Sequence, residues 1–168
     1  PTGVYFVTHG VQGHQFSYLR AGSAASRMAP AWVREEAPLR VLQGCRILHV
    51  SGISLAISPT ACDAAFEAMA LARAAGARIA FDPNLRLKLW PLERARACIA
   101  HAVSLCDIFL PSLEDMAALT GLTEPDALID WGHARGAAHV VLKLGDEGAI
   151  ASTRGGPSQR VQGRAATL

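Results

Sequence analysis

The sequence lacks the features that mark several large classes of protein. Aromatic residues make up only 6% of its 168 residues, and sixteen basic residues face fourteen acidic ones, a formal net charge of +2. The arginines are scattered rather than gathered into the basic stripe that nucleic-acid binding usually needs. No apolar run approaches the roughly 18–20 residues of a membrane span. We therefore expect neither nucleic acid nor a membrane as a partner.

Closely spaced cysteines are also missing. The four cysteines show no C-x-x-C spacing, and the six histidines lack metal-ligand spacing, so a disulfide framework or a zinc site is not expected. No basic-then-apolar leader opens the chain. We expect reduced, mostly buried thiols in a cytoplasmic protein.

What is present is the pattern of a folded α/β protein, 51% hydrophobic and 18% charged. Residues 3–8 and 15–20 are typical of two antiparallel strands joined by a turn at 12–14. From residue 46 onward, short apolar strands alternate with helices, which predicts a mainly parallel sheet with helices on both faces. The strands are expected at 47–51, 78–81, 107–110 and 139–143, with returning strands at 149–152 and 159–162, and the helices begin near Ser58, Pro91, Ser112 and Pro125.

Ligands of such sheets bind outside the carboxyl ends of the strands, so the loops there are the candidate site. The loop Asp82-Pro-Asn-Leu-Arg86 offers carboxylate and amide oxygens and a guanidinium, which suit a phosphate or a carboxylate. The alternative is an ordinary Asp-Pro turn with Arg86 on the surface.

Two further loops have equally simple alternatives. Ser112 and Asp115 form a variant of the helix capping box, or they place a hydroxyl and a carboxylate near a metal or phosphate-bound water. The stretch from Lys143 through Gly145 to Gly148 is either a tight turn or a backbone that approaches a nucleotide closely. No P-loop, G-x-G-x-x-G or G-x-S-x-G motif is present.

The expected hairpin carries Tyr5, Tyr18 and Arg20. Because side chains alternate along a strand, Tyr18 and Arg20 share one face. Such a pair, pointing at a cleft, would suit a hydroxylated, anionic small molecule, whereas a solvent-facing sheet surface is the alternative.

Taken in order, these segments resemble the ribokinase-type (PfkB) family of carbohydrate kinases, and most of all its 2-keto-3-deoxygluconate kinase branch. The resemblance covers essentially the whole chain, because six motifs occur in the right order and spacing. They lie at residues 2–5, 18–26, 49–53, 81–86 with Trp90, 110–115 with 119–121, and 141–148.

The resemblance implies a role for individual residues. Tyr5, Tyr18 and Arg20 would hold a keto-deoxy sugar acid, with Arg20 facing its carboxylate, and Ile53 would line the sugar pocket. Asn84 and Arg86 match the loop that reaches the transferring phosphate, where Arg86 also contacts substrate. Ser112 and Asp115 stand where the family has an N-x-x-E motif, and the shorter Asp115 favours contact with Mg²⁺ through water. The resemblance also implies that ATP contacts Lys143, Gly145 and Gly148.

The resemblance also implies the architecture and activity of a longer parent protein. The expected fold is a ribokinase-like three-layer α/β core (residues 31–168) with a small β lid (residues 1–30). The full-length parent would use ATP and Mg²⁺ to phosphorylate 2-keto-3-deoxygluconate at its terminal hydroxyl. The chain is expected to be a central fragment, inactive alone, with its catalytic base, an Asp, beyond Leu168.

Three alternatives stay open at this point. The parent could be a fructokinase or ribokinase-type sugar kinase, or a nucleoside kinase, or a non-catalytic protein that binds sugar or nucleotide. Exposed strand edges on the lid favour a homo-oligomer formed through it.

Overall fold

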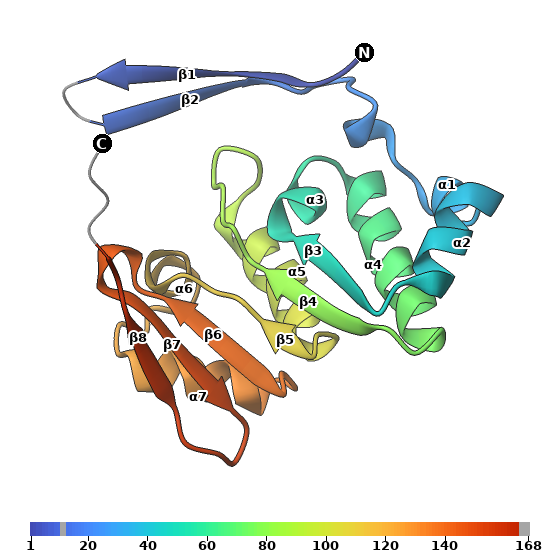
Figure 1. Cartoon of the computed structure of the whole chain (residues 1–168). Coiled ribbons are helices and arrows are strands. Elements are labelled where there is room, and N and C mark those ends of the chain that lie inside the picture. Colours follow the sequence, from blue (N-terminus) through green and yellow to red (C-terminus); the bar gives the residue numbers. More distant parts are fainter. Residues whose placement is uncertain (11–12, 165–168) are drawn as a thin grey trace.

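An antiparallel hairpin stands apart from the main sheet (Figure 1). The computed structural model describes residues 1–10 and 13–164, with the backbone alone for 13–16. Strand β1 (Val4–Gly10) pairs with β2 (Gly13–Leu19), and Tyr5 lies opposite Tyr18 in the register. The hairpin is confirmed, although both strands extend two residues further toward the turn than expected. Of the turn expected at 12–14, Gln12 lies outside the described residues.

The main sheet has six strands in the order β3-β4-β5-β6-β7-β8. The first four run parallel and the last two return antiparallel, so the mainly parallel α/β fold is confirmed. The strands are β3 (Ile47–Ser51), β4 (Arg78–Asp82), β5 (Ile108–Phe109), β6 (His139–Lys143), β7 (Gly148–Thr153) and β8 (Gln159–Gln162).

The four helices of the alternating pattern begin near the predicted residues. Ser58 and Ser112 cap α4 and α6 by accepting hydrogen bonds from the backbone N–H of Ala61 and Asp115, and Gly121 ends α6 with a left-handed φ of 78°. The helices are α4 (Pro59–Ala74), α5 (Leu92–Ser104), α6 (Leu113–Thr120) and α7 (Pro125–Ala134).

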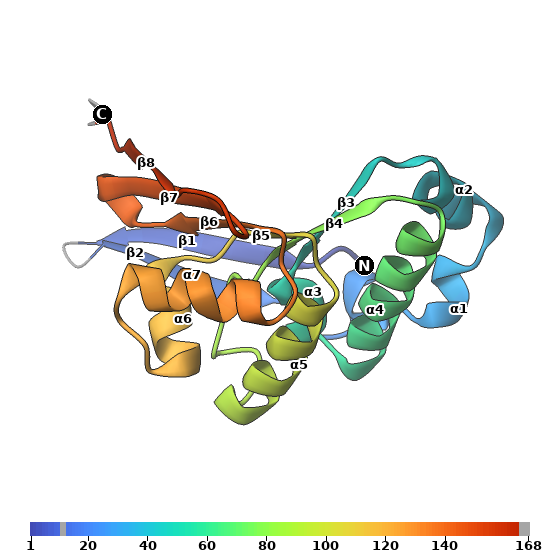
Figure 2. The same cartoon turned by 90° about the horizontal axis from the view of Figure 1, so that it is seen from below.

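Helices α4 to α7 lie together on one side of the sheet (Figure 2). The described part of the chain therefore does not form the layer of helices that the alternating pattern predicts for the other face. Within it, no helix has both the length and the apolar character needed to cross a membrane.

The core lies between the sheet and these helices. Phe81 of β4 and Phe109 of β5 are fully buried, with ring centroids 6.4 Å apart and nearly parallel planes. Met69, Ile99 and Leu142 are also fully buried. Removing these large apolar surfaces from water stabilises the sheet, which in turn fixes the positions of its carboxyl-end loops.

Short helices occupy a region for which the sequence analysis predicted none. They are a 3-10 turn η1 (Ala25–Arg27), α1 (Pro30–Val33), α2 (Glu36–Gly44) and α3 (Gly52–Ala56). Ser51 caps α3, so Ile53 lies in a helix rather than in a loop. A second 3-10 turn, η2 (Gly145–Glu147), joins β6 to β7.

Candidate functional site

The loops that follow β4, β5 and β6 close around one polar cavity of about 470 Å³. Parallel strands bring their carboxyl ends to the same edge of a sheet, which is why loops distant in sequence meet there. Six residues predicted for the site line this cavity: Asn84, Arg86, Ser112, Asp115, Lys143 and Gly145. Five lining residues were not predicted for it: Asp82, Leu113, Glu114, Leu144 and Asp146.

A larger cavity of about 640 Å³ lies beside α1, α2 and α4, away from these loops. Its lining is dominated by apolar side chains such as Trp32, Val41 and Leu42. Binding sites need a few convergent polar groups to orient a ligand, and the smaller cavity offers many more of them. We therefore take the smaller one as the candidate active site.

Asp82, the last residue of β4, is the centre of the polar contacts in this cavity. One carboxylate oxygen, Oδ1, accepts the backbone N–H of Asn84 at 3.1 Å. The other, Oδ2, accepts a hydrogen bond from Lys143 Nζ at 2.7 Å in an ion pair. Asp82 was expected only as one residue of a candidate loop, and its position at the end of a parallel strand was the signal that could have singled it out.

The loop after β4 holds Asn84 in an unusual backbone conformation. Its φ is 38°, the only positive value among the described non-glycine residues. Its side-chain nitrogen donates to Ser51 Oγ at 3.4 Å, which joins the loop to the cap of α3. Arg86 is exposed and donates to the carbonyl of Leu85 at 2.7 Å. Arg86 thus lies at the surface, and the loop also delivers an amide and a guanidinium to the cavity.

Ser112 and Asp115 act first as a helix cap. Ser112 Oγ accepts the N–H of Asp115 at 3.2 Å, and Asp115 Oδ2 accepts the N–H of Leu85 at 3.0 Å. The Asp115 carboxylate thus ties α6 to the loop after β4 while it lines the cavity. The capping interpretation is confirmed, and both residues also line the cavity.

The β6–β7 turn contributes backbone to the cavity. Gly145, with φ of 64°, lines it, whereas Gly148 does not. A Cβ on Gly148 would lie 2.1 Å from the carbonyl oxygen of Val161. The structure therefore explains Gly148 by its close packing against β8, the neighbouring antiparallel strand.

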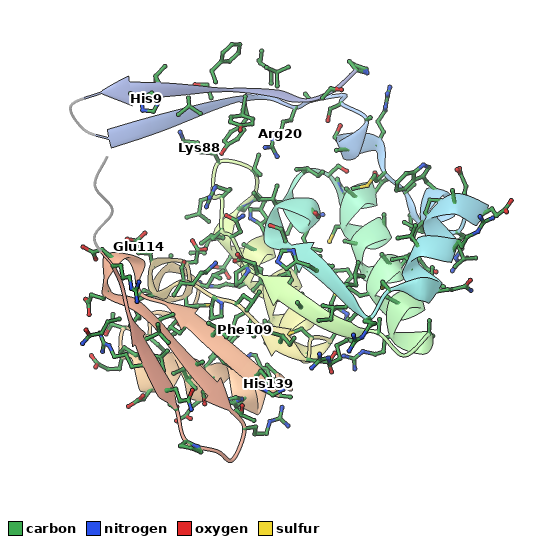
Figure 3. The ribbon with its side chains drawn as sticks, in the orientation of Figure 1. His9, Arg20, Lys88, Phe109, Glu114 and His139 are labelled. Atoms are coloured by element: carbon green, nitrogen blue, oxygen red, sulfur yellow. The ribbon has the colours of Figure 1, made fainter. Side chains whose placement is uncertain are left out.

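The remaining predicted residues lie outside the cavity. Tyr5 and Tyr18 face each other across the hairpin with ring centroids 6.3 Å apart, and the Arg20 guanidinium lies 4.7 Å from the Tyr18 ring centroid. The hairpin lies beyond the carboxyl ends of the parallel strands, and the loop carrying Lys88 rises toward it (Figure 3). Ile53 is linked to the loop after β4 through Ser51 Oγ, which accepts hydrogen bonds from the Ile53 N–H at 3.3 Å and from the Asn84 side chain at 3.4 Å.

The cavity contains charges of both signs. Arg86 and Lys143 can attract phosphate oxygens, and carboxylates of Glu114 and Asp146 lie on the same lining. Across residues 1–10 and 13–164, no three His, Cys, Asp or Glu side chains gather into a metal site of their own. Mg²⁺ usually binds one or two carboxylates together with water and substrate phosphates, and the donors here fit that mode of binding.

Known proteins with similar sequences are sugar kinases. The chain is 36% identical to 2-dehydro-3-deoxygluconokinase of Bacillus subtilis over 158 residues, which are 91% of this chain and 47% of that protein. It is 35% identical to fructokinase-2 of Solanum lycopersicum over 128 residues, 74% of this chain and 37% of the relative. The chain therefore spans at most about half the length of these relatives.

Solved structures lead to the same family. A PfkB protein from Polaromonas sp. JS666 matches 98% of this chain and 54% of its own, with a TM-score of 0.87 and 39% identity. A putative ribokinase II from E. coli, solved in complex with ATP and Mg²⁺, matches 98% of this chain and 51% of its own, with a TM-score of 0.84 and 25% identity. The family model for pfkB family carbohydrate kinases matches residues 1–167. Sequence, fold and family model agree, and the chain belongs to the pfkB family of carbohydrate kinases.

Proposed function

We propose that the full-length protein transfers the terminal phosphoryl group of ATP to the terminal hydroxyl of 2-keto-3-deoxygluconate (2-dehydro-3-deoxygluconate), giving the 6-phosphate. The observation that carries this proposal is the cavity where Arg86 and Lys143 converge from two strand ends beneath a hairpin bearing Arg20. The similarity to a 2-dehydro-3-deoxygluconokinase supports the choice of sugar acid.

The phosphate side of the proposed site is built from the cavity loops. Lys143 and Arg86 supply positive charge, Asn84 an amide and Ser112 a hydroxyl, while Gly145 lets the backbone come close to a nucleotide. Gly148 contributes by allowing this turn to pack closely against β8. Mg²⁺, when bound with ATP, neutralises charge that develops during phosphoryl transfer. Asp115 would hold it through water, because Asp115 Oδ2 already accepts the N–H of Leu85.

The sugar side is assigned to the hairpin and α3. Arg20 would pair with the substrate carboxylate, and its stacking on Tyr18 would keep the guanidinium in place. Tyr5 and Tyr18 offer hydroxyls to the sugar chain, and Ile53 packs against its carbons. Arg86, at the loop between the two sides, would contact both substrates.

The general base that removes the hydroxyl proton is expected outside these 168 residues. The family resemblance implies an Asp beyond Leu168. We accordingly expect the 168-residue chain to have no kinase activity by itself.

Steady-state kinetics of the full-length protein test the proposal. We expect ATP-dependent turnover of 2-keto-3-deoxygluconate and a higher KM for it in Arg20→Ala, because a charge-assisted hydrogen bond is lost. Turnover of fructose or ribose but not of the sugar acid would refute the substrate assignment. Binding of sugar or ATP without any turnover would instead favour a non-catalytic homologue.

Fructose is the second candidate substrate, because fructokinase-2 of Solanum lycopersicum is 35% identical to the chain. An uncharged sugar gives Arg20 no carboxylate to bind. If fructose is the substrate, Arg20→Ala should leave its KM nearly unchanged, so the same variant separates the two candidates.

The hairpin also supports a proposed homo-oligomer. Val4, Phe6 and Leu19 are each about half exposed or more, at 48%, 55% and 67%. Exposed apolar strands invite pairing with a second copy, and we assign residues 1–30 to a lid that serves this contact in a cytoplasmic enzyme. Sedimentation of the full-length protein should show an oligomer, and a monomer at all concentrations would contradict this.

A further inference from the structure

The Asp82 carboxylate joins two loops that lie 61 residues apart in the sequence. Oδ1 holds the N–H of Asn84, and Oδ2 holds the ammonium group of Lys143 at 2.7 Å. The Asp82 side chain is only 20% exposed, and that of Lys143 is 44% exposed. Each oxygen of this mostly buried carboxylate therefore has a partner on a different side of the cavity.

Both partners need such a restraint. Asn84 holds a backbone conformation that L-residues rarely adopt, and the surrounding structure must compensate for its cost. Lys143 carries its charge on a flexible four-carbon chain, which can take many positions unless a partner holds it. One carboxylate restrains both groups.

We propose that Asp82 is a positioning residue that couples the loop carrying Asn84 and Arg86 to the loop that begins at Lys143. This inference rests on the proposed kinase function, in which the first loop reaches the transferring phosphate and the second meets the nucleotide. Both oxygens of Asp82 are already engaged by protein groups, so its assigned role is to position Asn84 and Lys143. Asp82 sets where the Lys143 ammonium stands relative to the Asn84 amide.

Because Asp82 is negatively charged, a positioning role can be distinguished by experiment from a direct role in ATP binding. A carboxylate beside a phosphate site repels the phosphates directly, so removal of its charge alone is not expected to weaken ATP binding. A lost positioning contact misplaces the groups around the transferring phosphate, and this lowers kcat. Asp82 variants are therefore expected to show reduced kcat without a raised KM for ATP.

Two substitutions in the full-length protein test the proposal. Asp82→Asn keeps the shape and an acceptor for the Asn84 N–H but removes the charge that holds Lys143. Asp82→Glu keeps the charge but moves it by one methylene. Each should lower kcat by about tenfold or more, as expected for misplaced groups, with a KM for ATP no higher than that of the wild type.

Asp107 provides a closely matched control at the other end of the sheet. Its Oδ2 accepts the backbone N–H of Ile79 at 2.7 Å and a hydrogen bond from Arg73 at 3.2 Å. Asp107→Asn therefore disrupts a carboxylate with the same kinds of partner, but beside the beginning of β4. It should lower the Tm while leaving kcat and both KM values unchanged.

The outcomes separate this inference from the proposed function. If the wild type is active and Asp82→Asn keeps wild-type kcat, or raises only the KM for ATP, the positioning role is wrong and the kinase function stands. If the wild type phosphorylates no sugar, the proposed function is wrong. Hydrogen exchange then tests the coupling alone: Asp82→Asn should speed exchange in both 84–88 and 143–147, and unchanged exchange there would overturn it.

Discussion

Asp115 Oδ2 accepts the backbone N–H of Leu85 at 3.0 Å, so the first turn of α6 holds the loop that follows β4. The two residues lie 30 positions apart and belong to different parallel strand–helix connections. Ser112 fixes Asp115 in turn by capping the helix. The arrangement makes a helix cap part of the candidate active site, because Asn84 and Arg86 belong to the loop that it holds.

Replacement of Asp115 by Ala should lower both stability and activity. Leu85 is buried, and its N–H would lose its partner, which costs about 1–3 kcal/mol of unfolding free energy. Asp115→Asn retains an acceptor oxygen and should lose less. Urea unfolding together with kcat/KM of the full-length protein would measure this, and wild-type stability in Asp115→Ala would contradict the anchoring role.

Two substitutions at Asn84 separate its backbone from its side chain. Asn84→Ala must keep a φ of 38° without the polar side chain that helps tolerate it, whereas Asn84→Gly adopts that conformation freely. We expect a lower Tm for the Ala variant than for the Gly variant. Both should lose most activity if the amide meets the transferring phosphate. A fully active Asn84→Gly would mean that only the backbone conformation matters.

Gly52 should not tolerate a side chain. A Cβ at Gly52 would lie 1.9 Å from the carbonyl oxygen of Pro83, so the loop after β4 would have to move. Gly52→Ala should destabilise the protein by about 1–3 kcal/mol, as overpacking usually does, and reduce kcat/KM. Gly44 is the control, because a Cβ there meets nothing within 4 Å. Equal Tm values for the two alanine variants would refute the close approach.

The four thiols should react with iodoacetamide in an order set by their surroundings. Burial raises the pKa of Cys106 to about 12, with nearby Asp107 adding to it. Burial and then the neighbouring Cys98 raise the pKa of Cys62 to about 11. Since the thiolate is the nucleophile, peptide mapping at pH 8 should find Cys45 and Cys98 modified before these two. Early labelling of Cys106 would contradict the prediction.

The raised pKa values of Cys62 and Cys106 also predict how the unfolding free energy changes with pH. Above the ordinary thiol pKa of 9.0, the unfolded chain releases protons that the folded chain still holds at Cys62 and Cys106. The stabilisation is complete below pH 9 and is lost as pH rises toward the folded values, so unfolding free energy should fall across pH 9–11. Cys106→Ser should weaken this dependence, and an identical pH profile would contradict the assignment.

Much of the fold could be predicted from local patterns. The strands at 47–51 and 139–143 and the caps at Ser58 and Ser112 are confirmed at the predicted positions, because apolar runs and capping side chains act over a few residues. The helices α1 and α2 were not predicted, because the alternating pattern begins only at residue 46; they contain Pro30 and Pro38. Both prolines lie in the first turn of a helix, where the missing N–H has no partner to lose.

The candidate site could be predicted at the level of loops but not of contacts. Parallel strands bring their carboxyl ends together, so the convergence of Asn84, Ser112 and Lys143 followed from the strand pattern. The ion pair of Asp82 with Lys143 could not be predicted from the strand pattern, because it depends on loop lengths and on the path of each side chain.

The sequence by itself determined the order of strands and helices, the family and the loops that carry polar residues, since these depend on residue spacing and short-range hydrogen bonds. Only the tertiary structure decided that the Asp82 carboxylate contacts both Asn84 and Lys143, that Gly148 packs against β8, and that helices α4 to α7 share one face. Those arrangements depend on packing between distant segments, where distances of a few ångströms decide which polar groups meet.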